Sequence, residues 1–143
     1  MATTAESCTG GGVAYAITDI SGSSAWFDRS FITYTNVAKM QMLGVEETTL
    51  QTHGAVSQEV VRAMALGALR YSVAQLSVAI SGIAGPQGGT ADKPVGTVWF
   101  AWALSAEPSA SVVTECFHLS GDRRQVREQA IRIALQGMCK LIQ

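Results

Sequence analysis

Charged side chains are scarce in this sequence of 143 residues. Asp, Glu, Lys and Arg make up 15% of it, against roughly 25% in an average soluble domain, and the formal net charge is -1. Without a basic excess, the chain lacks the electrostatic footprint of a nucleic-acid-binding protein. Because 48% of the residues are hydrophobic, we expect another subunit to cover part of the surface, as in a homodimer.

Long apolar runs and paired cysteines are also missing. No stretch is long enough to span a bilayer, and no basic segment followed by an apolar core marks a signal peptide, so no membrane association is expected. Cys8, Cys116 and Cys139 form no C-x-x-C pair, which favours a reducing compartment and hence the cytoplasm. His53 and His118 stand alone without the spacing of metal ligands, so no metal site is expected.

Apolar and β-branched runs alternate with helical patterns along the chain. The patterns predict strands at 2–5, 25–34, 76–80, 95–103 and 112–119. They predict helices at 11–20, 36–44, 57–71 and 121–141, the last with a capping box in which Asp122 is the N-cap and Gln125 reaches back to it. A polar linker or a helical turn is expected at 45–53, and a hairpin-like connection at 106–109. Interleaved strands and helices, with a strand pair near the C-terminus, indicate an α/β sandwich with a mixed sheet. The length fits a single domain over residues 1–143.

The first informative stretch is 6–12, where small polar residues and glycines lie between a predicted strand and a helix. This order directs several backbone N–H groups at a helix N-terminus toward one point, where an anion or a developing oxyanion could bind. Ser7 would lie at the lip of such a site as a nucleophile. The stretch is neither a Walker A loop nor a G-x-S-x-G elbow. Taken alone, it is more often an N-cap and a tight turn.

The second stretch is 34–39. Asn36 is a good N-cap, which makes Lys39 the third helical residue, facing the positive end of the helix dipole. That placement lowers the pKa of a lysine, and burial lowers it further. A partly neutral amine can act as a general base for a serine. The alternative is a solvated lysine without a role.

The third stretch, 81–90, is rich in glycine and follows a buried strand. Its backbone must approach something closely, or it is merely a mobile loop. It lacks the G-x-G-x-x-G spacing of dinucleotide-binding loops. The three stretches begin at Ser7, Tyr34 and Ser81, each after a predicted strand. Because ligands bind beyond the carboxyl ends of strands in such sheets, the stretches could converge on one site.

Six segments in this order resemble the CinA C-terminal domain family, which includes stand-alone nicotinamide-nucleotide amidases. The segments are 5–11, 22–27, 34–39, 81–86, 93–98 and 121–123. The resemblance implies a three-layer α/β/α sandwich that tends to dimerise and needs no metal or organic cofactor. It also implies hydrolysis of the carboxamide of nicotinamide mononucleotide to nicotinate mononucleotide and ammonia, a step of pyridine nucleotide recycling.

The resemblance also implies roles for individual residues. By motif position, Ser7 matches the family's nucleophile, Lys39 its general base and Tyr34 the tyrosine proposed to assist by relaying a proton or holding Lys39. The residues expected to contact the substrate are Cys8, Thr9, Gly10, Gly11, Asn36, Gly82, Ala84, Gly85 and Arg123. Among these, the glycine-rich loop and Arg123 are the candidates for binding the phosphate.

One departure from the family pattern bears on activity. Family members usually carry a helix before the first strand, and this sequence begins almost at that strand, so we expect the helix to be missing. Its loss would expose apolar sheet surface. The alternatives to an amidase are therefore a nucleotide-binding accessory domain with little or no turnover, and a structural dimer module without a ligand.

Overall fold

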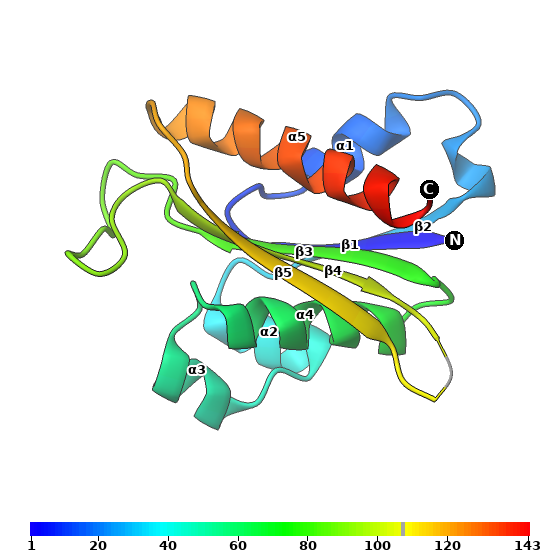
Figure 1. Cartoon of the computed structure of the whole chain (residues 1–143), viewed down its shortest axis with the longest axis horizontal. Coiled ribbons are helices and arrows are strands. Elements are labelled where there is room, and N and C mark those ends of the chain that lie inside the picture. The colour runs from blue at the N-terminus through cyan, green and yellow to red at the C-terminus, as the bar shows by residue number, and fades with distance from the viewer. Residues whose placement is uncertain (107) are drawn as a thin grey trace.

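A five-stranded mixed β-sheet forms the middle of the molecule (Figure 1). The computed structural model describes residues 1–106 and 108–143. The strands lie in the order β2-β1-β3-β4-β5. β1 (Ala2–Glu6) runs parallel to β2 (Phe27–Ile32) and β3 (Leu76–Gly82). β4 (Thr97–Leu104) and β5 (Ser111–His118) complete the sheet as an antiparallel pair, as the sequence predicted.

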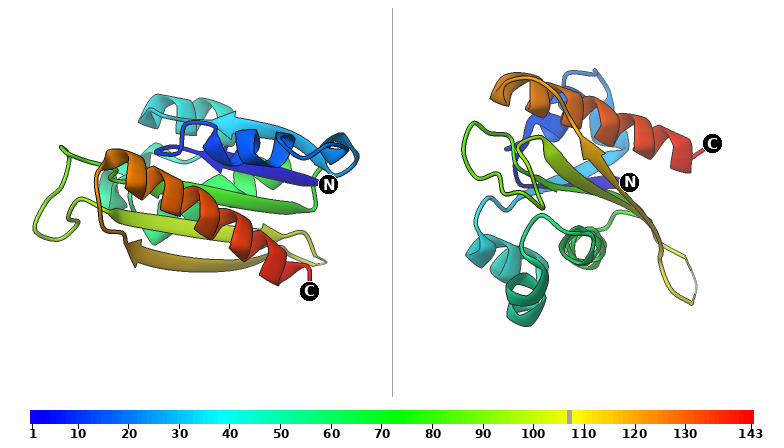
Figure 2. Two further views of the ribbon diagram at one scale, coloured as in Figure 1. Left: turned by 90° about the horizontal axis from the view of Figure 1, so that it is seen from above. Right: turned by 60° about the vertical axis from the view of Figure 1, so that its left-hand side comes forward.

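Helices cover both faces of this sheet. α1 (Gly12–Thr18) and α5 (Arg123–Leu141) lie on one face. α2 (Asn36–Leu43), α3 (Glu47–His53) and α4 (Gln58–Arg70) lie on the other (Figures 1 and 2). The three-layer α/β/α sandwich is therefore confirmed. No helix within residues 1–106 and 108–143 has the length and apolar character needed to cross a membrane.

Side-chain size differs between the two faces of the central strands. Successive residues of a strand point to opposite faces, so each strand contributes to two cores. Val78, Phe100 and Trp102 are buried in the core beneath α1 and α5. Ala79 and Ala101 are buried in the core beneath α4. The small side chains on the second face leave room for α4 to lie close to the sheet.

The structure differs from the sequence prediction at 45–53 and at 25–34, and a third segment lies partly outside the described residues. The expected linker at 45–53 contains helix α3, in which Leu50 is the buried residue. The alternative of a helical turn was therefore correct, but one buried leucine in a polar helix of seven residues produces no apolar periodicity that would predict a full helix. The expected strand at 25–34 is shorter, Phe27–Ile32, and its first residue belongs to a short 3-10 helix, Ser23–Ala25. The expected connection at 106–109 includes residue 107, which lies outside the described residues.

Candidate active site

The three stretches singled out in the sequence meet in one pocket of about 210 Å³ at the carboxyl ends of β1, β2 and β3. The expected site residues that line it are Ser7, Cys8, Tyr34, Asn36, Lys39, Gly82, Ala84 and Arg123. Parallel strands end at the same edge of a sheet, which is why segments far apart in the chain come together here.

Ser7 and Lys39 form a buried pair at the bottom of this arrangement. The Lys39 Nζ lies 3.0 Å from the Ser7 Oγ, although the residues are 32 positions apart in the chain. Only 1% of Lys39 and 7% of Ser7 is exposed. The Lys39 Nζ also donates a hydrogen bond of 2.7 Å to the backbone carbonyl of Thr33. That bond orients the amine, so that its lone pair, when the amine is neutral, can accept the serine proton.

Helix α2 delivers Lys39 to this position, with a different cap from the one expected. Thr35 has extended backbone angles, and its Oγ1 accepts a hydrogen bond of 3.1 Å from the N–H of Ala38. Thr35 is therefore the N-cap and Asn36 the first helical residue, so the prediction of Asn36 as N-cap is wrong. Two good capping residues stand side by side here, and sequence alone does not separate them. Lys39 remains in the first turn, where helical side chains lean toward the N-terminus.

Burial sets the protonation of the pair. Desolvation lowers the pKa of the Lys39 amine from 10.5 to about 8, and a nearby Cys8 thiolate would oppose this shift. Burial also raises the pKa of the Cys8 thiol to about 11. At neutral pH the thiol is therefore protonated and a poor nucleophile, while part of the lysine is neutral. The chemistry of the pocket favours Ser7 over Cys8.

The N-terminus of α1 is occupied by the protein's own carboxylate, so the N–H groups of Val13 and Ala14 are not free for a ligand anion. The Glu6 Oε1 accepts a hydrogen bond of 2.9 Å from the N–H of Val13, and its Oε2 accepts one of 3.0 Å from that of Ala14. The N–H of Gly10 donates to the carbonyl of Ser7 at 3.0 Å and closes the turn. Glu6 thus satisfies donors that the sequence pattern assigned to a ligand.

Several expected substrate contacts lie outside the pocket. Thr9 is fully buried, and its hydroxyl donates to Glu6 at 2.7 Å. Gly10 and Gly11 do not line the pocket; they form the turn behind it. Gly85 does not line it either, but its carbonyl accepts a hydrogen bond from Arg123.

Arg123 joins three segments of the chain at the rim of the pocket. Its Nη1 donates to the carbonyl of Gly85 and its Nη2 to the hydroxyl of Tyr34, both at 2.9 Å. Tyr34 is therefore held by Arg123, whereas the carbonyl of Thr33 holds Lys39. The predicted capping box is present: Asp122 accepts from the N–H of Gln125, and the Gln125 side chain accepts from that of Asp122. The capping box thus starts α5 at Arg123, the residue that reaches the site.

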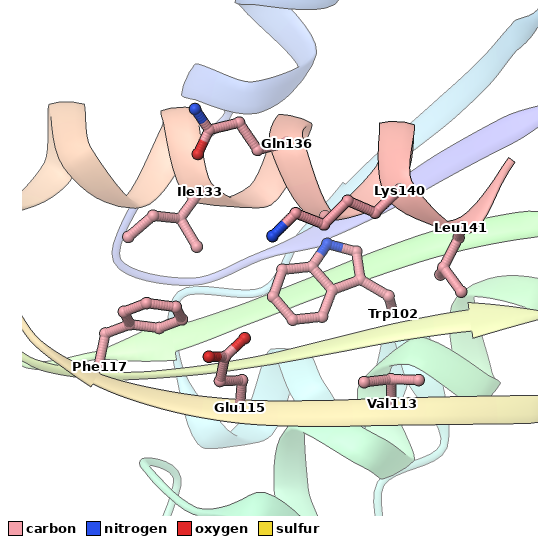
Figure 3. A pocket seen from close by; sticks show the side chains of 9 residues that line it. Trp102, Val113, Glu115, Phe117, Ile133, Gln136, Lys140 and Leu141 are labelled. Atoms are coloured by element: carbon pink, nitrogen blue, oxygen red, sulfur yellow. The ribbon is translucent and has the colours of Figure 1, made fainter. Parts of the chain in front are cut away.

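A second and larger hollow, about 420 Å³, lies between α5 and the edge strand β5. Figure 3 shows Phe117 from the sheet below Ile133 from α5, and Trp102 beside Leu141, with Glu115 and Lys140 between them. No serine, cysteine or histidine lines it, so it lacks a nucleophile with an adjacent base. The pocket at Ser7 is therefore the better candidate for hydrolytic chemistry. Among the described residues, no group of three His, Cys, Asp or Glu side chains could hold a metal ion.

Comparison with known proteins decides the family. The family model for the CinA C-terminal domain matches residues 1–142. The chain belongs to the CinA C-terminal domain family. The resemblance seen in the sequence motifs is thereby confirmed.

Relatives in the CinA family are similar over nearly the whole chain. The nicotinamide-nucleotide amidohydrolase PncC of Escherichia coli K12 is 62% identical over 136 residues, which cover 95% of this chain and 81% of that protein. The Pseudomonas putida protein of the same name is 52% identical, over 97% of this chain and 84% of its own. The crystal structure of competence/damage inducible protein CihA from Agrobacterium tumefaciens is 48% identical and superposes with a TM-score of 0.94, over 100% of this chain and 86% of that chain.

The structure adds residues to this candidate site that sequence reasoning missed. Ala55 and Val56 also line the pocket, as does Ser81, the first residue of the third stretch. Ala55 and Val56 lie in the connection between α3 and α4, whose position depends on a helix that the pattern did not predict. Thr33 contributes a backbone carbonyl, and every residue has one, so no sequence signal could have singled it out.

Proposed function

We propose that this chain hydrolyses the carboxamide of nicotinamide mononucleotide to nicotinate mononucleotide and ammonia, a step in the recycling of pyridine nucleotides. Relatives with 62% and 52% identity are named nicotinamide-nucleotide amidohydrolase, and the chain is accordingly an amidohydrolase. The observation that supports the proposed mechanism is the 3.0 Å separation between the Ser7 Oγ and the Lys39 Nζ in a buried pocket.

Ser7 is the nucleophile and Lys39 the base in this proposal. The neutral amine takes the hydroxyl proton while the Oγ attacks the carboxamide carbon, which gives a tetrahedral intermediate. The ammonium then donates its proton to the substrate nitrogen, the C–N bond breaks and ammonia leaves. Water, deprotonated by Lys39, attacks the ester on Ser7. The acid is released, and the proton returns to Ser7.

The tetrahedral intermediate needs donors for its oxyanion. The backbone N–H of Cys8 directly follows the nucleophile and donates to no other residue in the described part of the chain. Cys8 also lines the pocket. We therefore assign this N–H to the oxyanion, a role in which one donor is worth on the order of 10²–10³-fold in kcat.

The rim of the pocket supports recognition of an anionic nucleotide. Arg123 brings a positive charge next to Tyr34 and the loop that contains Gly82 and Ala84. A guanidinium is well suited to a phosphate, because its donors match the phosphate oxygens. In this proposal Tyr34, bound by Arg123, orients the substrate, and Asn36 contributes a polar contact from the start of α2.

The test is release of ammonia from nicotinamide mononucleotide by the purified protein. Ser7→Ala and Lys39→Met should each remove most of the turnover. Lys140→Met is a matched control, because Lys140 lies in the hollow beside β5 and should leave the rate unchanged. A folded wild-type protein that releases no ammonia above buffer would reject the function. If the mononucleotide then still raises the Tm, the chain is a nucleotide-binding domain instead.

We also infer that the chain forms a homodimer. Its low charge content and high hydrophobic content support this, as does the edge strand β5, which pairs with β4 on one side. Sedimentation at micromolar concentration should give twice the chain mass, and a clean monomer would reject the dimer.

A further inference from the structure

Two oppositely charged side chains form hydrogen bonds to the turn that carries Ser7. Arg127 extends from α5, where its Nε donates to the carbonyl of Cys8 at 3.0 Å and its Nη2 to that of Thr9 at 3.2 Å. Glu6 forms hydrogen bonds to the same turn from its buried side. Arg127 does not line the pocket, so these contacts are its role in the described structure rather than a contact with substrate.

The Glu6 carboxylate is fully buried and surrounded by donors. Besides the two N–H groups at the start of α1, it accepts hydrogen bonds from the hydroxyls of Thr9 at 2.7 Å, Thr4 at 3.1 Å and Ser30 at 3.2 Å. A buried charge is tolerated when it is hydrogen-bonded in this way. These bonds tie the turn to β1, β2 and α1 at once.

We propose that Glu6 and Arg127 are positioning residues that together hold the Ser7 hydroxyl in register with Lys39. The inference rests on the proposed function and deepens it. Neither residue touches the reacting atoms; both act through the turn between Ser7 and Gly10.

Peptide geometry explains how these hydrogen bonds affect the position of the nucleophile Ser7. A peptide group is planar, so fixing the direction of its carbonyl also fixes the N–H that follows. Arg127 therefore sets the peptide planes after Cys8 and Thr9, and the next N–H, that of Gly10, donates to the carbonyl of Ser7. Gly10 has a φ of 59°, a conformation that glycine adopts freely, so the turn has little stiffness of its own. The two charged side chains supply the missing rigidity.

The expected effect on catalysis is large because the geometry is demanding. A displacement of about 1 Å in a reacting group can cost on the order of 10²-fold in rate. Arg127→Lys keeps the charge but loses the paired donation to two carbonyls, and Arg127→Met loses both. We expect kcat to fall about 10- to 100-fold in both variants, with KM within about twofold of wild type. The pH midpoint of the rate should stay unchanged, because burial sets the pKa of Lys39 and Arg127 does not contribute to it.

Arg124→Met is the matched control. Arg124 lies on the same helix, its side chain is 86% exposed, and its partner is Glu128 at 2.9 Å. It should retain the wild-type kcat. A kcat in Arg127→Met equal to that in Arg124→Met would overturn the proposal. So would a loss that follows only the fraction of unfolded protein in the assay, because that loss would be structural.

Amide hydrogen exchange tests, without any substrate, whether Glu6 and Arg127 hold the turn in place. The Gly10 amide should exchange at least about tenfold faster in Arg127→Met than in wild type, and no faster in Arg124→Met. Glu6→Gln, if it folds, should show the same increase; if it does not fold, the Arg127 variants decide. An unchanged rate at Gly10 would overturn the proposal. Wild-type protein that releases no ammonia would reject the proposed function, and exchange would still decide whether the turn is held.

Discussion

The pH dependence of turnover tests the chemistry of Lys39 in quantitative terms. The amine must be neutral to accept the proton of Ser7, and burial lowers its pKa from 10.5 to about 8. At pH 7 a lysine with a pKa of about 8 is neutral in about a tenth of the molecules, against roughly 3 in 10,000 for an unperturbed lysine. Burial therefore increases the population of the reactive form about 300-fold.

We expect kcat/KM for nicotinamide mononucleotide to rise about tenfold per pH unit below pH 7 and to level off above about pH 8. Ammonia release between pH 6 and 10 measures the profile. Lys39→Arg should show no such rise, because a guanidinium does not lose its proton in this range. A wild-type rate that falls between pH 7 and 9, or that does not change, would refute lysine as the base.

The same shift changes folding stability. Between about pH 8 and 10.5 the unfolded chain binds the Lys39 proton and the folded chain does not, so the free energy of unfolding rises with pH in this window. Relative to Lys39→Met, the wild type should gain on the order of 2–3 kcal/mol from pH 7.5 to 10.5. The Cys8 thiol also titrates at high pH but is common to both proteins. Urea unfolding measures the difference, and a constant difference would contradict a buried amine.

Further substitutions test three individual features of the structure. Cys8→Ala should keep most of the ammonia release that Ser7→Ala loses, because burial keeps the thiol protonated; the reverse result would make the thiol the nucleophile. Thr35→Ala should lower the free energy of unfolding in urea by about 1 kcal/mol and Asn36→Ala should hardly change it, since Thr35 is the cap; equal losses would contradict this. Gly67→Ala should cost roughly 2–3 kcal/mol in thermal unfolding, because the added methyl would overlap the last carbonyl of α2, and an unchanged Tm would contradict that close packing.

Much of this fold could be predicted because local signals and global topology agree. The apolar strand at 97–104 and its partner at 111–118 follow the expected pattern, and the capping box at Asp122 marked the start of α5. The convergence of three stretches followed from one rule, that parallel strands end at a common edge. Ser7 and Lys39 could therefore be suggested as neighbours before their distance was known.

The missing parts of the prediction depend on groups without a sequence signal. The carbonyl of Thr33 orients Lys39, but a backbone atom is not visible in a sequence. Glu6 occupies the helix N-terminus that the glycine-rich pattern assigned to an anion. The pattern does not show whether the bound carboxylate belongs to the protein or to a ligand. Arg127 reaches the turn of Ser7 across 119 positions of sequence, a contact that only the packing of α5 against α1 creates.

Trapping the covalent intermediate tests the central claim most directly. The protein would be mixed with nicotinamide mononucleotide, quenched with acid within milliseconds to seconds, digested and examined by mass spectrometry. The account predicts an ester between the nicotinate mononucleotide acyl group and the peptide that contains Ser7, with no adduct in Ser7→Ala. An adduct on Cys8, or turnover without any adduct while Ser7→Ala stays active, would contradict it.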